Sequence, residues 1–307
     1  WYNNEDVINL EVNPNVEIFD TNNNRFGSKK IQQYNFNGVK VRSKNCSETF
    51  YTCDHIETID ISSWNMINNT NFYAMFSSST DIAEGISSLR TVKLPADCGN
   101  KVTQCHKMFG WHRGLKTITG MITVDFSNCI NFSEMFCECF RLKNIDFKID
   151  NWVTSKATDI HSMFLKCYDL DFSKVGDFTT WDVSNVTDAS GLFANCGFVN
   201  LDLSGWDLSK CKTTTNMFQD ELQVHKTINF SNCNWTTTPD SSNNMFSKCN
   251  ILEKIIAKGA SSIVQQFLKL RLVTDIPDRV SSNEFILVLD DGNYRFNKIS
   301  NEWIKVS

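Results

Sequence analysis

A phenylalanine recurs along this chain at nearly constant spacing, and this repeat limits the fold more than any other feature. It follows a Met, Leu or Thr each time, and successive intervals are 26, 33, 27, 28, 29, 25 and 28 residues. The eight positions are Phe50, Phe76, Phe109, Phe136, Phe164, Phe193, Phe218 and Phe246. Such a period predicts a stack of equivalent units.

Other residue types keep the same register as the phenylalanine. A cysteine stands three residues after it at Cys53, Cys139, Cys167, Cys196 and Cys249. A tryptophan stands twelve residues before it at Trp64, Trp152, Trp181 and Trp206. A unit of this length cannot bury its own apolar face, but stacked units bury it against one another. We therefore expect these residues to form interior columns.

Each unit is expected to contain a strand, a turn, a short helix and a return. Alternating runs such as Ile59-Asp60-Ile61 and Leu201-Asp202-Leu203 have the period of a strand with one face inward. Segments such as residues 181–188 are rich in turn and cap formers, which predicts a turn followed by a short helix carrying the Met-Phe pair. The fold class is therefore a leucine-rich-repeat-like solenoid of about eight coils.

The ends of the chain depart from the repeat. Residues 1–45 are expected to form a β-rich cap, residues 46–257 the solenoid, and residues 258–273 a capping helix that starts at a serine. Residues 274–307 read as a β-hairpin module with an Asp-Gly turn. In that module, Tyr294, Phe296 and Trp303 are interpreted as a small core, with contact to another subunit as the alternative.

The repeat phrases carry a family resemblance. Residues 201–209, Leu-Asp-Leu-Ser-Gly-Trp-Asp-Leu-Ser, and residues 192–196, Leu-Phe-Ala-Asn-Cys, resemble BspA-like leucine-rich repeats and the related repeat of mycoplasma lipoproteins. This resemblance implies a surface protein active in adhesion, with no catalytic motif. The C-terminal pattern of residues 290–306 resembles small modules of bacteriophage tail and fibre proteins, which implies a virion protein.

Composition and charge exclude other classes of function. The net charge is −5, and no run of Lys and Arg suggests binding to nucleic acid. No apolar run reaches the roughly 18 to 20 residues that cross a bilayer. Among the five histidines, only His106 and His112, near Cys105, approach a cluster, and a surface or core role is favoured for them. We expect no catalytic site, metal or cofactor.

Most of the twelve cysteines fall at repeat positions, which favours packed interior thiols. Reduced thiols suit folding in a cytosol, whereas cysteines stacked in adjacent coils can also approach closely enough to form disulfides. Both alternatives stay open at this point.

Binding is expected on the outward strand face or at the terminal modules. The residues proposed to contact a partner are Asp60, Asp146, Asp202 and Asn229, which recur between inward strand residues; a solvated strand face is the alternative.

Two functions follow. The favoured one is a bacteriophage virion component, a tail fibre or capsid appendage assembled in the host cytoplasm, that recognises a host-surface protein or glycan or a neighbouring virion subunit, as a homo-oligomer. The alternative is a BspA-like adhesin, at the surface of a bacterium or protist or secreted from it.

Overall fold

The computed structural model describes residues 44–53, 55–78, 87–99 and 101–306, and the backbone of four short strands that precede them. These are β1 (Asn9–Glu11), β2 (Glu17–Ile18), β3 (Gln33–Asn35) and β4 (Lys40–Val41), paired in parallel as β1–β3 and β2–β4. The predicted N-terminal cap of residues 1–45 otherwise lies outside the described residues, apart from residues 44 and 45.

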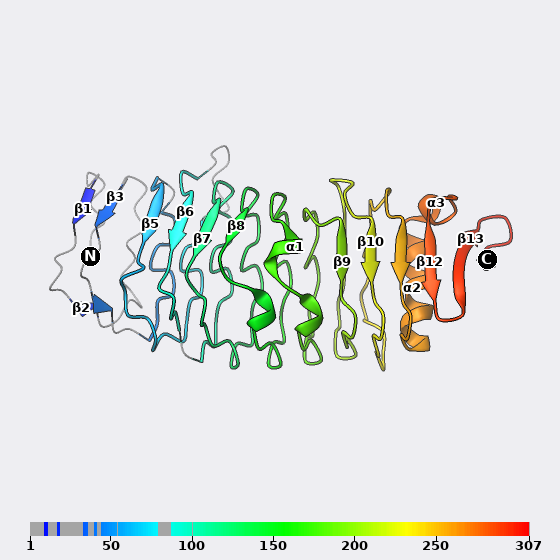
Figure 1. Cartoon of the computed structure of the whole chain (residues 1–307), viewed down its shortest axis with the longest axis horizontal. Helices are drawn as coiled ribbons and strands as arrows, with labels where there is room; N and C mark the ends of the chain where they lie inside the picture. The colour runs from blue at the N-terminus through cyan, green and yellow to red at the C-terminus, as the bar shows by residue number, and fades with distance from the viewer. Residues whose placement is uncertain are drawn as a thin grey trace.

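Short strands follow one another along the long axis of the molecule (Figure 1). The first sheet holds four parallel strands, β5 (Thr58–Asp60), β6 (Thr91–Lys93), β7 (Thr117–Thr119) and β8 (Asn144–Ile145). The second begins with parallel strands β9 (Asn200–Asp202), β10 (Thr227–Asn229) and β11 (Lys254–Ile256). In the three-residue strands of both sheets the middle residue is buried, as in Ile59 and Leu201. This arrangement agrees with the predicted repeat solenoid.

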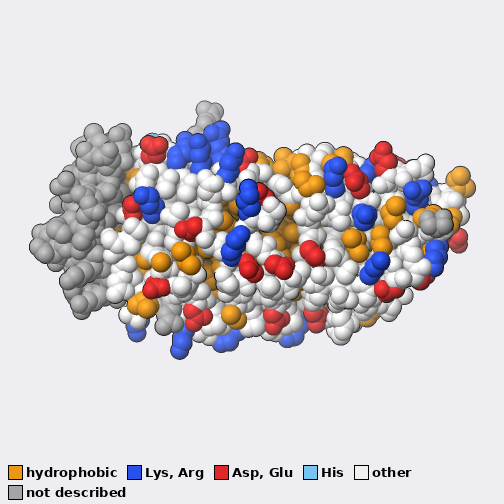
Figure 2. Space-filling view, in the orientation of Figure 1, with side chains coloured by type: hydrophobic (Ala, Val, Ile, Leu, Met, Phe, Trp, Pro, Cys, Tyr) orange, Lys and Arg blue, Asp and Glu red, His pale blue; other side chains and the backbone are white. Residues whose placement is uncertain are grey.

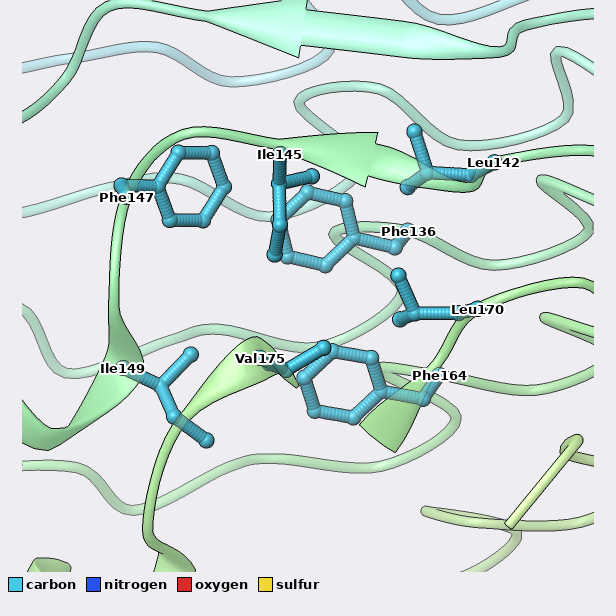
Figure 3. Close-up of a pocket in the computed structure, with 8 residues that line it drawn as sticks. All are labelled: Phe136, Leu142, Ile145, Phe147, Ile149, Phe164, Leu170 and Val175. Carbon is cyan, nitrogen blue, oxygen red and sulfur yellow. The ribbon is translucent and has the colours of Figure 1, made fainter. Parts of the chain in front are cut away.

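A coil without a strand separates the two sheets. Its short helix α1 (Phe172–Val175) lies between β8 and β9, and the Asp171 carboxylate caps it by accepting from the Ser173 N–H at 3.1 Å. The 3₁₀ helices η1 (Ile149–Asn151) and η2 (Phe178–Thr180) lie on either side of α1 in the chain. Apolar side chains fill the interior here (Figure 3): Phe136, Leu142, Ile145, Phe147, Ile149, Phe164, Leu170 and Val175. The core is therefore continuous across the break.

The eight repeated phenylalanines form the predicted interior column. Their rings stack from Phe50 to Phe246 with centroids 5.3 to 6.0 Å apart and nearly parallel planes. All eight side chains are almost completely buried. Because each ring contacts the ring of the next coil, the column binds the coils together along the molecule.

The segment that carries the Met-Phe pair is not helical, which corrects the sequence prediction. Two residues before every repeated Phe the backbone has positive φ, at Glu48, Ala74, Lys107, Glu134, Ser162, Gly191, Asn216 and Asn244. A left-handed residue cannot continue a right-handed helix. Some backbone N–H groups instead close tight turns: the Tyr51 N–H donates to the Glu48 carbonyl. The groups between them donate to the next coil, as the Phe50 N–H does to the Met75 carbonyl.

The recurring cysteines satisfy carbonyl groups inside the solenoid. The Sγ atoms of Cys139, Cys167, Cys196 and Cys249 each donate to the carbonyl of the repeated Phe one coil earlier, at 2.9 to 3.2 Å. A thiol suits this position because it is a small apolar group that is also a weak donor. All twelve cysteines are buried free thiols, and the Sγ atoms of Cys105 and Cys129 are 3.2 Å apart.

The tryptophans make an equivalent ladder. The indole N–H of Trp206 donates to the Phe178 carbonyl at 2.8 Å, and that of Trp235 donates to the Trp206 carbonyl at 3.0 Å. These two buried indoles therefore each have an acceptor in the preceding coil, as a buried polar group requires.

Helix α2 (Ser262–Asp275) covers the last coil at the C-terminal end (Figure 1). Ser261 caps its start, and Val264, Phe267, Leu268 and Leu272 are buried. The last coil has no following coil to accept its N–H groups. Asp275 supplies an acceptor in place of that missing coil: its Oδ2 accepts from the Phe246 N–H at 3.1 Å. Among the described residues, no helix is both long and apolar enough to span a membrane.

The C-terminal strands extend the solenoid's own sheet. After the short helix α3 (Pro277–Val280), β12 (Ile286–Leu289) pairs in parallel with β11, and β13 (Gly292–Asn297) and β14 (Glu302–Val306) follow as antiparallel strands. Trp303 packs on Phe296 and Phe285, as expected of a small core. The C-terminal strands therefore include antiparallel pairs, and the parallel pairing of β12 with β11 joins them to the last coil.

Candidate binding surface

The four residues predicted to bind a partner lie on the outward face, at or just after the strands. Asp60, Asp146 and Asp202 are exposed and Asn229 is half-buried. The strand register places Asp202 beside Asn229, whose Nδ2 donates to Asp202 Oδ1 at 3.0 Å. The structure therefore brings two of the four together.

The other two are separated from this pair. Asp60 lies opposite Lys93, which lies opposite Thr119, so two coils stand between Asp60 and Asp146. The coil of α1 separates the two sheets beyond that. The four residues do not form the single column that the repeated Asp and Asn suggested.

Local turns account for much of the recurrence of these residues. Asp60, Asp202 and Asn229 each accept from the backbone N–H two residues later, at 2.9 to 3.1 Å. Partial burial raises the pKa of Asp60, but hydrogen bonds from Ser62 and Lys93 outweigh burial, and the pKa lies below its ordinary value. These side chains direct the chain out of the strand, as Asx turns do.

A second outward row lies where neighbouring coils meet through isolated parallel bridges. Seven bridges link Asn45, Asn71, Gln104, Asn131, Asp159, Asp188, Thr213 and Ser241 in succession. Several of these side chains accept the N–H two residues later, as Asn131 and Asp188 do. The row therefore combines turn formation with a line of polar groups along the molecule.

His161 lies at the centre of this second row. Its Nδ1–H donates to Asp159 Oδ1 at 2.8 Å, and its Nε2 is 3.4 Å from Glu134 Oε1. Hydrogen bonds to Asp159 and then Glu134 raise the pKa of His161 to about 10. The His106 ring is 6.4 Å away, while His112 is buried beside Ser87. His106 and His112, the two histidines noted in the sequence, therefore do not form a cluster: His106 lies near His161, and His112 lies in the interior beside Ser87.

Asp159, His161 and Asp188 also have the donor set of a divalent metal site, with ligand atoms within 4.8 Å of one another. However, His161 ligates a metal only after losing its proton. The raised pKa shows that the surrounding carboxylates favour the imidazolium. We therefore interpret His161 as the counterion of these carboxylates.

Replacing His161 with Gln is expected to lower the thermal midpoint most at pH 6 and progressively less as the pH rises toward 10. The folded pKa of about 10 exceeds the ordinary value, so the stabilisation is fully present below pH about 6.5 and lost as the pH rises through the folded value. Thermal unfolding of both proteins at pH 6, 8 and 10 measures the difference. In an Asp159→Asn background the pH dependence should shrink, and a wild-type difference that stays constant with pH would contradict the assignment.

Basic residues from three successive coils are aligned just before β6, β7 and β8. Arg90, Lys116 and Lys143 each precede a strand, and the strand register aligns them. Their backbones are directly connected, because the Lys116 N–H bonds to the Arg90 carbonyl at 2.9 Å and the Lys143 N–H to the Lys116 carbonyl at 3.0 Å. With the exposed Arg141 they form what we call the basic stripe. Lys and Arg side chains gather over this end of the first sheet in Figure 2.

A buried carboxylate supports the neighbouring surface. Glu138 is 6% exposed and pairs with Arg113 and Lys166, each at 2.7 Å. The Arg113 guanidinium lies 5.2 Å from the centre of the Phe140 ring, and Phe140 stacks on Tyr168 at 4.9 Å. The half-buried Phe140 ring therefore packs against Arg113 and Tyr168 beside the basic stripe.

Sequence reasoning missed the basic stripe because its members come from different coils. Only the alternating residues within each strand were considered as outward positions. The available signal was a basic residue just before the strand in consecutive repeats, at Arg90, Lys116 and Lys143. Lys116 and Lys143 each stand seven residues after the repeated Phe, whereas Arg90 stands fourteen residues after Phe76, so alignment on the phenylalanine finds only the two lysines.

The comparisons with known proteins concern the repeat. The family model described as Mycoplasma protein of unknown function, DUF285, matches residues 10–113, 98–174 and 130–259. A solved structure of a leucine-rich repeat protein from Bacteroides ovatus ATCC 8483 is similar, with 16% identity and a TM-score of 0.25, over 82% of this chain and 55% of that one. This chain thus spans little more than half the length of that protein. The search of curated proteins gave no match.

The predicted resemblance to a mycoplasma-type repeat is therefore confirmed, whereas the resemblance of the C-terminal strands to phage modules has no support. The matched ranges overlap and run from residue 10 to residue 259 of the 307. The chain belongs to the family described as Mycoplasma protein of unknown function, DUF285.

Proposed function

We propose that this chain is a non-enzymatic adhesin, displayed at a cell surface, that binds a surface component of another cell. Its apolar interior holds the coils together, and its polar rows face outward. The observation that carries the proposal is the basic stripe, in which cations from three coils are aligned although the protein as a whole is acidic. Lys116, Arg141 and Lys143 are exposed, and Arg90 is half-buried. Like charges aligned in register disfavour folding, so we infer that they serve binding.

The virion hypothesis loses its main support. It rested mainly on the resemblance of the C-terminal pattern to phage modules, and β12 pairs in parallel with β11 of the solenoid. These strands therefore serve as the end of the sheet in our account. A protein held at a cell surface can act as a single copy, whereas virion subunits work as symmetric oligomers.

Two measurements on the whole chain test this function. Fluorescently labelled protein should bind cultured epithelial cells saturably, and unlabelled protein should compete for the same sites. Native mass measurement should give a monomer of about 35.2 kDa. Absence of saturable binding, or a symmetric oligomer as the dominant species, would contradict the adhesin proposal.

A further inference from the structure

We infer that the basic stripe binds a sulfated polysaccharide chain. This inference rests on the proposed function, because it names the chemical class of the surface component. The stripe consists of Arg90, Lys116, Arg141 and Lys143. Clusters of Lys and Arg on one face are suited to such polyanions.

The charges of the stripe are only partly neutralised by the protein. Lys143 lies 3.4 Å from Asp169, and both side chains remain substantially exposed. The Arg90 guanidinium donates to the carbonyls of Ser87 and Leu89, which carry no charge. Within the described ranges, Lys116 and Arg141 have no carboxylate partner. The stripe therefore keeps an excess of positive charge facing solvent.

The second sheet provides a contrast at the same position of the repeat. Lys226 precedes β10 as Lys116 precedes β7, but the following coil has Glu253 there. Lys226 and Glu253 form an ion pair at 3.0 Å. In the second sheet this column is therefore self-neutralised. In the first sheet it begins with Glu57 before β5 and continues with three successive cations, Arg90, Lys116 and Lys143.

The shape of the stripe favours a single extended chain. Its cations belong to coils about 4.8 Å apart, so they form a narrow line of positive charge. The surrounding protein carries a net charge of −5, which opposes broad contact with a duplex or an anionic bilayer. Single-stranded nucleic acid is bound by stacking its bases on aromatic faces. Phe140, the aromatic residue next to Arg141, already packs against Arg113 and Tyr168. A thin sulfated chain can contact the line of cations without touching the acidic surface around it.

A bilayer would also need exposed apolar side chains beside the cations. The residues next to the stripe cations, Leu89, Leu115 and Leu142, are instead buried in the core. Contact with a polysaccharide needs only the outward charges.

The test measures binding of the full chain to heparin by calorimetry at low and moderate salt. The variant Lys116→Glu with Lys143→Glu reverses two exposed charges of the stripe. The control Lys226→Glu with Lys254→Glu makes the same charge change at exposed positions of the second sheet. Circular dichroism should show that both variants keep the wild-type fold, because all four side chains are exposed.

We expect the stripe variant to lose at least about tenfold in heparin affinity and the control less than about twofold, since close charge contacts dominate such binding. Desulfated heparin should bind far more weakly, and added salt should weaken the wild-type complex. Equal affinity in the two variants would overturn the inference, as would duplex DNA or phosphatidylserine vesicles binding as tightly as heparin. A chain that binds cells but not heparin refutes this inference alone. A chain that binds neither refutes the proposed function as well.

Discussion

Replacing Phe164 with Ala is expected to lower the free energy of unfolding by about 3 to 5 kcal/mol, because a large cavity opens in a packed core. The ring is 1% exposed. It stacks between Phe136 at 5.6 Å and Phe193 at 6.0 Å, and Phe172 and Phe178 contact it edge-on. Chemical denaturation measures the change.

The matched control is Val153→Ala, which shortens a side chain that is 50% exposed. It should change the free energy of unfolding by less than about 0.5 kcal/mol, as surface substitutions usually do. A loss below about 1 kcal/mol for Phe164→Ala would contradict the claim that stacked rings hold neighbouring coils together.

Replacing Asp275 with Ala is expected to destabilise the protein by about 1 to 3 kcal/mol, because buried N–H groups of the last coil lose their acceptor. Burial raises the pKa of Asp275, and hydrogen bonds from Phe246, Asn244 and Met245 oppose that effect. The carboxylate is 3% exposed and lies 3.7 Å from Arg271.

Hydrogen exchange measures where this stability is lost. The amides of residues 244–246 should exchange faster in Asp275→Ala, while those near β5 should be unchanged. Asp278→Ala, in an exposed carboxylate that pairs with Lys298, is the matched control and should leave both regions protected. Equal protection of residues 244–246 in both variants would show that Asp275 does not cap the solenoid.

The interior of this fold could be predicted from sequence because stacked repeats place equivalent residues in columns. The phenylalanine register therefore located the core without knowledge of the coil's path. The prediction of a short helix at the Met-Phe pair was wrong because of the backbone conformation. The left-handed positions of this segment are occupied by residues such as Glu48, Ala74 and Lys107, which are not residue types that predict a positive φ. Contacts from coil to coil impose that conformation.

The binding surface was less predictable than the core. Asp60, Asp202 and Asn229 recur as a ligand column would, but each also closes its own turn, and sequence alone does not separate these roles. Arg90, Lys116 and Lys143 were overlooked because they stand just outside the strands. The break at α1 was also hidden, since Phe172 and Val175 are as apolar as strand residues and helix there depends on the Asp171 cap.

One continuous solenoid is the central claim, because both the core columns and the aligned surface charges depend on it. The distance between spin labels attached through unnatural amino acids at Thr58 in β5 and Lys254 in β11 tests it most directly. These exposed positions begin equivalent strands in coils joined by seven bridge steps, so at about 4.8 Å per step we expect one narrow distribution near about 34 Å. A broad distribution, or one centred far from this value, would contradict a continuous stack.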